Sequence, residues 1–190
     1  MRVAIIDDNE VNILRVKQLL SSHMSDCASI TFTDSAAGLE WCRENRPDLV
    51  MVDYRMPPPD GLQFIEAFRA APGNEHTPLL MLTATQDLPV RHRALQLGAN
   101  DFLNYPLDET EFLARVTNML ALRKSQLKLA ARADWLAGEV AKATEEIVAR
   151  ERETILRLSR AAEYRDPDTG AHILRMAKYC GLIARHLGLP

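Results

Sequence analysis

The chain has 190 residues, of which 47% are hydrophobic and 26% are charged, a balance typical of a soluble globular protein with a substantial core. Its three cysteines form no CxxC pair, which argues against a disulfide framework or a zinc cluster. The sequence has no signal-peptide pattern and no apolar run of the roughly 18–20 residues that cross a bilayer, so we expect a cytoplasmic protein.

Charge is unevenly distributed along the chain. Residues 1–120 hold 10 Lys and Arg against 17 Asp and Glu, whereas residues 121–190 hold 13 against 9. The acidic part fits a cation-dependent site, and the other part is too mixed in sign to indicate a nucleic-acid arm. No helix-turn-helix pattern follows, so we do not expect DNA as a partner. Because no apolar run is long enough to cross a bilayer, we do not expect a membrane as a partner either.

Short apolar runs predict five strands, separated by amphipathic helical patterns. Several runs are continuous rather than alternating, which is typical of strands buried on both faces of a parallel sheet. The predicted strands are Val3–Ile6, Ile30–Phe32, Leu49–Val52, Leu79–Leu82 and Asp101–Leu103. This βα alternation over about 120 residues predicts a doubly wound α/β fold, whose ligand site lies at the carboxyl ends of the strands.

A long helix is predicted after Pro106, because no proline occurs from Leu107 to Asp166 and strong helix formers dominate. Apolar or small residues recur at alternating spacings of three and four: Leu122, Leu129, Ala133, Leu136, Val140, Ala143 and Ile147. Gln126 and Arg150 fall on the same stripe, which then slips by one residue to Ile155, Leu158 and Ala162, as a stutter does. So narrow a stripe indicates a parallel two-stranded coil with a second copy. The alternative is an antiparallel hairpin turned at Gly138.

Three carboxylates are expected to meet at one edge of the sheet. Asp7 and Asp8 follow the first predicted strand, and Asp53 follows the third. Such a group repels itself unless a cation neutralises it, and oxygen ligands of this kind suit Mg²⁺. Thr83 and the small Ala84 end the fourth strand at the same place, where the hydroxyl could donate to a phosphoryl oxygen. Taken alone, the acidic pair could also cap a helix.

Four motifs at these strand ends carry a family resemblance. They are Asp7-Asp8, the run Asp-Tyr-Arg-Met-Pro-Pro-Pro-Asp-Gly at 53–61, Thr83-Ala84, and Gly-Ala-Asn-Asp-Phe at 98–102. In this order and spacing they resemble the receiver domain of two-component response regulators over residues 1–122. The resemblance implies a flavodoxin-like, five-stranded fold.

The resemblance also implies a chemistry. Asp53 would be the phosphoacceptor, attacking the phosphohistidine of a sensor histidine kinase or phosphotransfer protein to give an acyl phosphate. Mg²⁺ would be held by Asp8, Asp53 and the backbone carbonyl of Arg55, with Asp7 acting partly through water. The cation offsets the charge of the transferring group.

Three further positions follow from the same resemblance. Thr83 would move toward the phosphoryl oxygen, and Phe102, at the aromatic switch position, would rotate inward. The family places a lysine where this chain has Tyr105, and the next lysine in the sequence is Lys124. A tyrosine hydroxyl donates a hydrogen bond but carries no positive charge. We expect retained phosphorylation with weaker coupling to the output, and the alternative is a degenerate receiver that is not phosphorylated.

The last segment shows a second, shorter resemblance. A turn pattern at 165–170 precedes an apolar-periodic helix. Residues 162–172, followed by Arg175, Tyr179 and Leu-Gly-Leu at 187–189, resemble the opening of an HD-GYP domain, a family that hydrolyses cyclic di-GMP at a two- or three-metal site. Asp168 and His172, four residues apart, are the candidate ligands for divalent metal ions of unknown identity, although the family usually has Glu at the first position. The motifs that name the family do not occur in the 190 residues.

We therefore expect three parts: a receiver at 1–122, a coiled-coil signalling helix at 123–162 and an incomplete HD-GYP output domain at 163–190. Read in this way, the chain belongs to a homodimeric response regulator whose whole protein hydrolyses cyclic di-GMP. The alternative is a fragment of a cyclic di-GMP phosphodiesterase whose receiver is degenerate and works without phosphorylation.

Overall fold

The computed structural model describes residues 1–84, 88–165 and 167–188, except for the side chains of 162–170. It contains two compact units, Met1–Leu129 and Ala130–Pro190, and each is considered by itself. In the described residues, no helix is long and apolar enough to cross a membrane.

The first unit is built on a five-stranded sheet in which all strands are parallel. Its order is β2-β1-β3-β4-β5, so the chain reverses direction across the sheet beside β1 and β3. The strands are β1 Arg2–Ile6, β2 Ala28–Phe32, β3 Leu49–Asp53, β4 Leu79–Thr83 and β5 Asp101–Asn104. This confirms the predicted doubly wound parallel sheet, with strand ends that differ by one or two residues.

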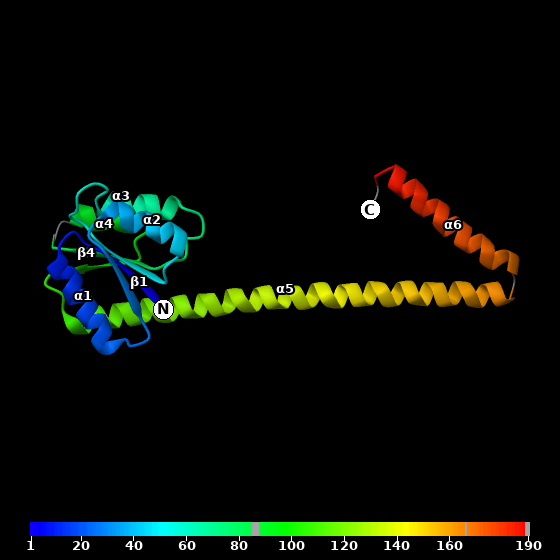
Figure 1. The fold of residues 1–190 in the computed structure, drawn as a ribbon, viewed down its shortest axis with the longest axis horizontal. Helices are drawn as coiled ribbons and strands as arrows, with labels where there is room; N and C mark the ends of the chain where they lie inside the picture. The colour runs from blue at the N-terminus through cyan, green and yellow to red at the C-terminus, as the bar shows by residue number, and fades with distance from the viewer. Residues whose placement is uncertain (85–87, 166, 189–190) are drawn as a thin grey trace. The chain divides into compact units, whose positions relative to one another are not determined.

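Helices cover both faces of this sheet (Figure 1). The helices of this unit are α1 Glu10–His23, α2 Ser35–Asn45, α3 Gly61–Ala70, α4 Leu88–Gln96 and the beginning of α5 Glu109–Arg165. The rest of α5 and α6 Pro167–His186 belong to the second unit. One core forms under α1 and the beginning of α5, which buries Phe112 and Val116. The other forms under α2, α3 and α4, where Phe64 and Phe68 are fully buried. Because both faces are covered, β3 and β4 are buried at every residue, as their continuous apolar sequences predict.

Polar caps begin the helices at the carboxyl edge of the sheet. Asn9 accepts a hydrogen bond from the N–H of Val11, and Asp60 forms a reciprocal capping box with Gln63. The first residue of α3 lies against β3, since a Cβ added to Gly61 would lie 2.5 Å from the carbonyl oxygen of Asp53. Glycine is therefore needed for this close approach, which keeps the beginning of α3 beside the acidic edge.

The long helix is confirmed: α5 has 57 residues and continues through Gly138, so the alternative of a hairpin turned there is wrong. Its apolar side chains in the second unit are exposed, including Leu136 at 47% and Val140 at 65%. The predicted turn at 165–170 coincides with the change from α5, which ends at Arg165, to α6, which begins at Pro167, so most of its residues already belong to α6. Proline suits the first position of a helix, where its missing N–H would have no partner within the helix.

A half-buried arginine joins two loops to the end of α3 at the amino edge of the sheet. Nε of Arg69 donates to the carbonyl of Gly98 at 2.9 Å, and Nη1 donates to the carbonyls of Asn74 at 2.5 Å and Thr77 at 2.8 Å. Nη2 donates to Oδ1 of Asn100 at 2.9 Å. One planar guanidinium thus fixes the end of α3, the loop before β4 and the loop before β5.

Arg69→Lys should lower the free energy of unfolding by about 2–4 kcal/mol, because an ammonium cannot reproduce this fork and leaves buried carbonyls without donors. Urea denaturation of the chain measures the change. Arg43→Lys on the exposed surface of α2 is the matched control and should change stability little. Equal stabilities for the two variants would contradict the structural role of Arg69.

Candidate phosphoacceptor and metal site

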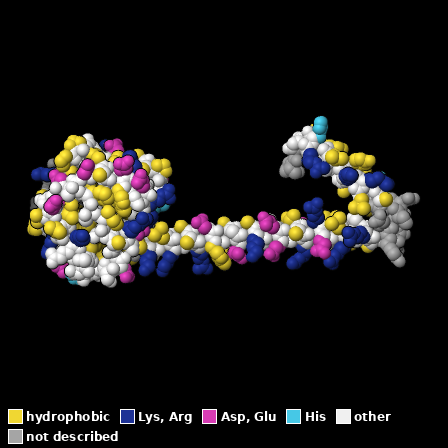
Figure 2. All heavy atoms as spheres, in the orientation of Figure 1, with side chains coloured by type: hydrophobic (Ala, Val, Ile, Leu, Met, Phe, Trp, Pro, Cys, Tyr) yellow, Lys and Arg dark blue, Asp and Glu magenta, His cyan; other side chains and the backbone are white. Residues whose placement is uncertain are grey.

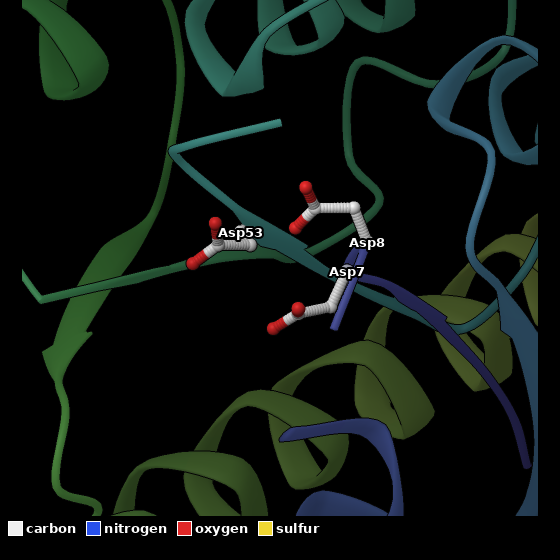
Figure 3. A group of neighbouring side chains, drawn as sticks. All are labelled: Asp7, Asp8 and Asp53. Atoms are coloured by element: carbon white, nitrogen blue, oxygen red, sulfur yellow. The ribbon is translucent and has the colours of Figure 1, made fainter. Parts of the chain in front are cut away.

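Three carboxylates meet at the carboxyl edge of the sheet, as the sequence predicts. Strands β1 and β3 are neighbours with Ile6 paired to Val52, so the residues that follow in each strand emerge side by side. Oxygen atoms of Asp7, Asp8 and Asp53 lie within 4.8 Å of one another. Figure 3 shows the three side chains gathered around one space, from the end of β1 and the end of β3.

Asp7 is buried and is held by three donors. Its Oδ1 accepts from the N–H of Asn9 at 2.8 Å and from Nδ2 of Asn12 at 3.3 Å. Its Oδ2 accepts from the hydroxyl of Tyr105 at 3.0 Å. Burial raises the pKa of Asp7, and these hydrogen bonds offset part of that rise. The side chain is therefore fixed in place while its negative charge remains poorly solvated.

Asp53 is 7% exposed, and its Oδ2 accepts a 2.7 Å hydrogen bond from the N–H of Arg55. Burial, and then the nearby charge of Asp7, raise the pKa of Asp53 from 3.8 to about 6. At neutral pH the ionised carboxylate thus carries an electrostatic penalty that a cation would relieve. Asp8 is exposed, which leaves one side of the cluster open to solvent.

The donor set fits a hard divalent cation. All three side chains offer carboxylate oxygens, the ligands that Mg²⁺ prefers. A groove reaches the cluster from outside and is lined by Asp8, Tyr54, Arg55, Met56, Pro57, Asp60 and Val90. A partly hydrated ion or a small phosphodonor therefore has a path to the cluster at Asp8. Among the described residues, no other group of three His, Cys, Asp or Glu side chains is placed to hold a metal.

The other predicted receiver residues lie on β4, which is next to β3, and on β5, which is next to β4. Thr83 is the last residue of β4, is fully buried and pairs with Asn104 of β5. Phe102 is half-buried on β5, and the guanidinium of Arg91 lies over its ring, 4.6 Å from the centroid. Arg91 also donates to Oδ1 of Asn104 at 2.7 Å. Our sequence reasoning missed Arg91, since nothing in its local pattern indicates a contact across α4 and β5.

Tyr105, at the position where the family has lysine, does reach the cluster, through the hydrogen bond to Asp7. Burial and the charge of Asp7 raise the pKa of its phenol, so it is a neutral donor. For the second predicted site, the structure places the side chain of one of the two candidate ligands. His172 is exposed on α6, and the side chain of Asp168 lies outside the described residues.

The fold and this cluster define a class: an α/β protein with strand order 2-1-3-4-5 and an acidic centre at the switch point beside β1 and β3. The chain belongs to the response regulator receiver domain family, whose sequence model matches residues 3–117. Solved structures agree with this fold. A response regulator receiver domain protein from Clostridium thermocellum aligns with a TM-score of 0.60 at 25% identity, covering 66% of this chain and 98% of that one.

Two curated relatives match well beyond the receiver. The cyclic di-GMP phosphodiesterase response regulator RpfG of Xanthomonas campestris pv. campestris is 36% identical over 189 residues, which are 100% of this chain and 50% of the relative. A probable cyclic di-GMP phosphodiesterase of Vibrio cholerae is 29% identical over 185 residues, which are 97% of this chain and 41% of the relative. The chain thus spans half or less of the length of these relatives.

Asp53→Asn should stabilise the metal-free fold at neutral pH, because it removes a buried charge. A carboxyl whose pKa rises on folding stabilises the fold fully below about pH 4, and this contribution is lost as the pH rises through 6. The gain in the free energy of unfolding should therefore be about 1 kcal/mol larger at pH 8 than at pH 5, and it should reach about 2–3 kcal/mol at most.

Urea denaturation with a chelator present measures this gain. Asp34→Asn is the control, because asparagine keeps a capping oxygen at the beginning of α2 and should change stability little. A gain that stays constant or shrinks as the pH rises would contradict the buried-charge explanation.

Proposed function

We propose that this chain is the receiver and signalling helix of a two-component response regulator that accepts a phosphoryl group on Asp53. The observation that carries the proposal is the group of three carboxylates, with oxygens within 4.8 Å of one another, at the carboxyl edge of a receiver fold. The phosphodonor is a sensor histidine kinase or a phosphotransfer protein, and the reaction takes place in the cytoplasm.

Asp53 is the nucleophile in this proposal. One of its oxygens forms a bond to phosphorus as the bond from phosphorus to the imidazole nitrogen of the donor breaks, which gives an acyl phosphate and a free histidine. The N–H of Arg55 keeps the second oxygen in place during the attack. The hydroxyl of Thr83 then approaches a phosphoryl oxygen, and Phe102 rotates inward away from Arg91.

Magnesium is the proposed cofactor, and its charge would offset that of the transferring group. Asp8, Asp53 and the backbone carbonyl of Arg55 would hold it, with Asp7 acting partly through water. The exposure of Asp8 beside the groove leaves room for the ion and its remaining waters.

Phosphorylation is tested with acetyl phosphate and Mg²⁺, followed by intact mass measurement. The native chain should gain one phosphoryl group, and Asp53→Asn should gain none. Asp34→Asn should label as the native chain does, because Asp34 caps α2 and is not one of the three clustered carboxylates. Equal labelling of native protein and Asp53→Asn would disprove the assignment.

A folded native chain that takes no label would favour a second function, which is a fragment of a metal-dependent cyclic di-GMP phosphodiesterase with a degenerate receiver. The observation that favours this second function is Tyr105, which brings no positive charge to the site.

The output of the signalling protein is also part of the proposal. Similarity to RpfG continues through the whole of this chain rather than stopping with the receiver. We infer that the long helix connects the receiver to an HD-GYP domain acting on cyclic di-GMP, of which residues 163–190 are the beginning. Asp168 and His172 would be two of the ligands for its metal ions.

Dimerisation is proposed to occur through α5. Figure 2 shows hydrophobic side chains interspersed with charged ones along this helix. Leu136 is nearly half exposed, and more than half of Val140 is exposed, as it is of Ile147, Ile155 and Leu158 farther along the stripe. A second copy of the helix in parallel would cover these residues. The one-residue slip near Arg150 is where two packings of the coil compete, so that receiver rearrangements could change the register.

Replacing Leu136 and Val140 together with Glu should convert a dimer into a monomer, because the coil would have to bury like charges opposite one another. Sedimentation velocity at tens of micromolar compares this variant with the native chain. The control places Glu at Ala131 and Ala141, which are exposed positions outside the stripe, and should remain dimeric. A native chain that sediments as a monomer would rule the coil out.

A further inference from the structure

Tyr105 is connected to the acidic cluster in a way that the family resemblance does not explain. Its hydroxyl donates to Oδ2 of Asp7 at 3.0 Å, across 98 positions of sequence. Its ring packs against the core under α1 and α5, which fixes the direction of the hydroxyl. The side chain at the lysine position therefore contacts the site, but as a neutral hydrogen-bond donor.

Asp7 depends on this contact for its orientation. Its Oδ1 is shared by two donors from the beginning of α1, the N–H of Asn9 at 2.8 Å and the amide of Asn12 at 3.3 Å. Tyr105 is the donor to the other oxygen. Without the hydroxyl, the carboxylate could pivot about the Oδ1 contacts, away from the negative charge of Asp53. Two asparagine contacts to one oxygen set its position, and the third contact sets its rotation.

The charges of the site make this orientation important for a cation. No ion pair formed among the described residues involves Asp7, Asp8 or Asp53. Carboxylates that repel one another turn apart unless donors hold them, and a metal then binds less well because the ligands must be brought back together. A ligand set held in place before binding avoids that loss.

We propose that Tyr105 is a positioning residue of the metal site, whose hydroxyl holds the Asp7 carboxylate in the orientation that supports a divalent cation. The proposal rests on the metal-assisted receiver function argued above. It predicts that the hydroxyl acts through Asp7 alone and strengthens binding of the cation, without touching the phosphoryl group.

Calorimetric titration of the 190-residue chain with Mg²⁺ tests the proposal. Tyr105→Phe removes one oxygen and keeps the packed ring. It should raise the Kd for Mg²⁺ about fivefold, because the Asp7 carboxylate loses one hydrogen bond that water replaces only in part. Asn12→Ala removes a different donor to the same carboxylate and should weaken binding in the same direction. Tyr179→Phe, on the exposed surface of α6, is the control and should leave the Kd unchanged.

A double-mutant cycle then asks whether the hydroxyl acts through Asp7. In the Asp7→Asn background, adding Tyr105→Phe should change the Kd by less than about 1.5-fold, because the carboxylate that the hydroxyl holds is no longer present. An unchanged Kd in Tyr105→Phe alone would overturn the proposal. A fivefold loss of Mg²⁺ affinity on adding Tyr105→Phe in the Asp7→Asn background would also overturn it.

The rate of labelling by acetyl phosphate separates positioning from direct contact with the phosphoryl group. Tyr105→Phe should need more Mg²⁺ for half-maximal rate but reach the native rate at saturation. A lower maximal rate with unchanged Mg²⁺ dependence would overturn the proposal in favour of direct contact. Calorimetry does not require phosphorylation, so failure of Asp53 to accept a phosphoryl group would be distinguishable from failure of this proposal.

Discussion

The repulsion among three carboxylates at the carboxyl edge of the sheet is the constraint on which the rest of this receiver depends. Parallel pairing of β1 with β3 brings Asp7 and Asp53 to the same edge, and burial deprives both of water. The surrounding structure compensates with hydrogen bonds from Asn9, Asn12 and Arg55, all in segments that follow a strand end. These donors are neutral, so they do not cancel the negative charge of the carboxylates. A divalent cation would neutralise that charge.

The replacement of a lysine by Tyr105 increases this dependence on the cation. A lysine would bring a positive charge into the cluster, whereas the phenol brings only a hydrogen bond to Asp7. In the proposed function, the response to phosphorylation would then rely more on Thr83 and Phe102. The guanidinium of Arg91 covers the ring of Phe102, so inward rotation of this ring would have to break a cation–π contact.

The sequence was sufficient to predict the strands, the order of elements, the long helix and the three acids. Continuous apolar runs and strand-end acids are local signals, and parallel topology turns them into one site. The contacts of Asn12, Arg91 and Tyr105 could not be predicted in this way, because each depends on how two elements distant in sequence pack together. The turn pattern at 165–170 contains Pro167, which suits a helix start as well as a turn, so the pattern alone does not show that α6 begins at this residue.

The most direct test of this account is a crystal structure of the chain grown with Mn²⁺, which stands in for Mg²⁺ and is located by its anomalous scattering. The account predicts a single strong peak among the carboxylates of Asp7, Asp8 and Asp53, with the Tyr105 hydroxyl still donating to Asp7. A map with no peak there at saturating Mn²⁺, or with the three side chains turned apart around water, would contradict it.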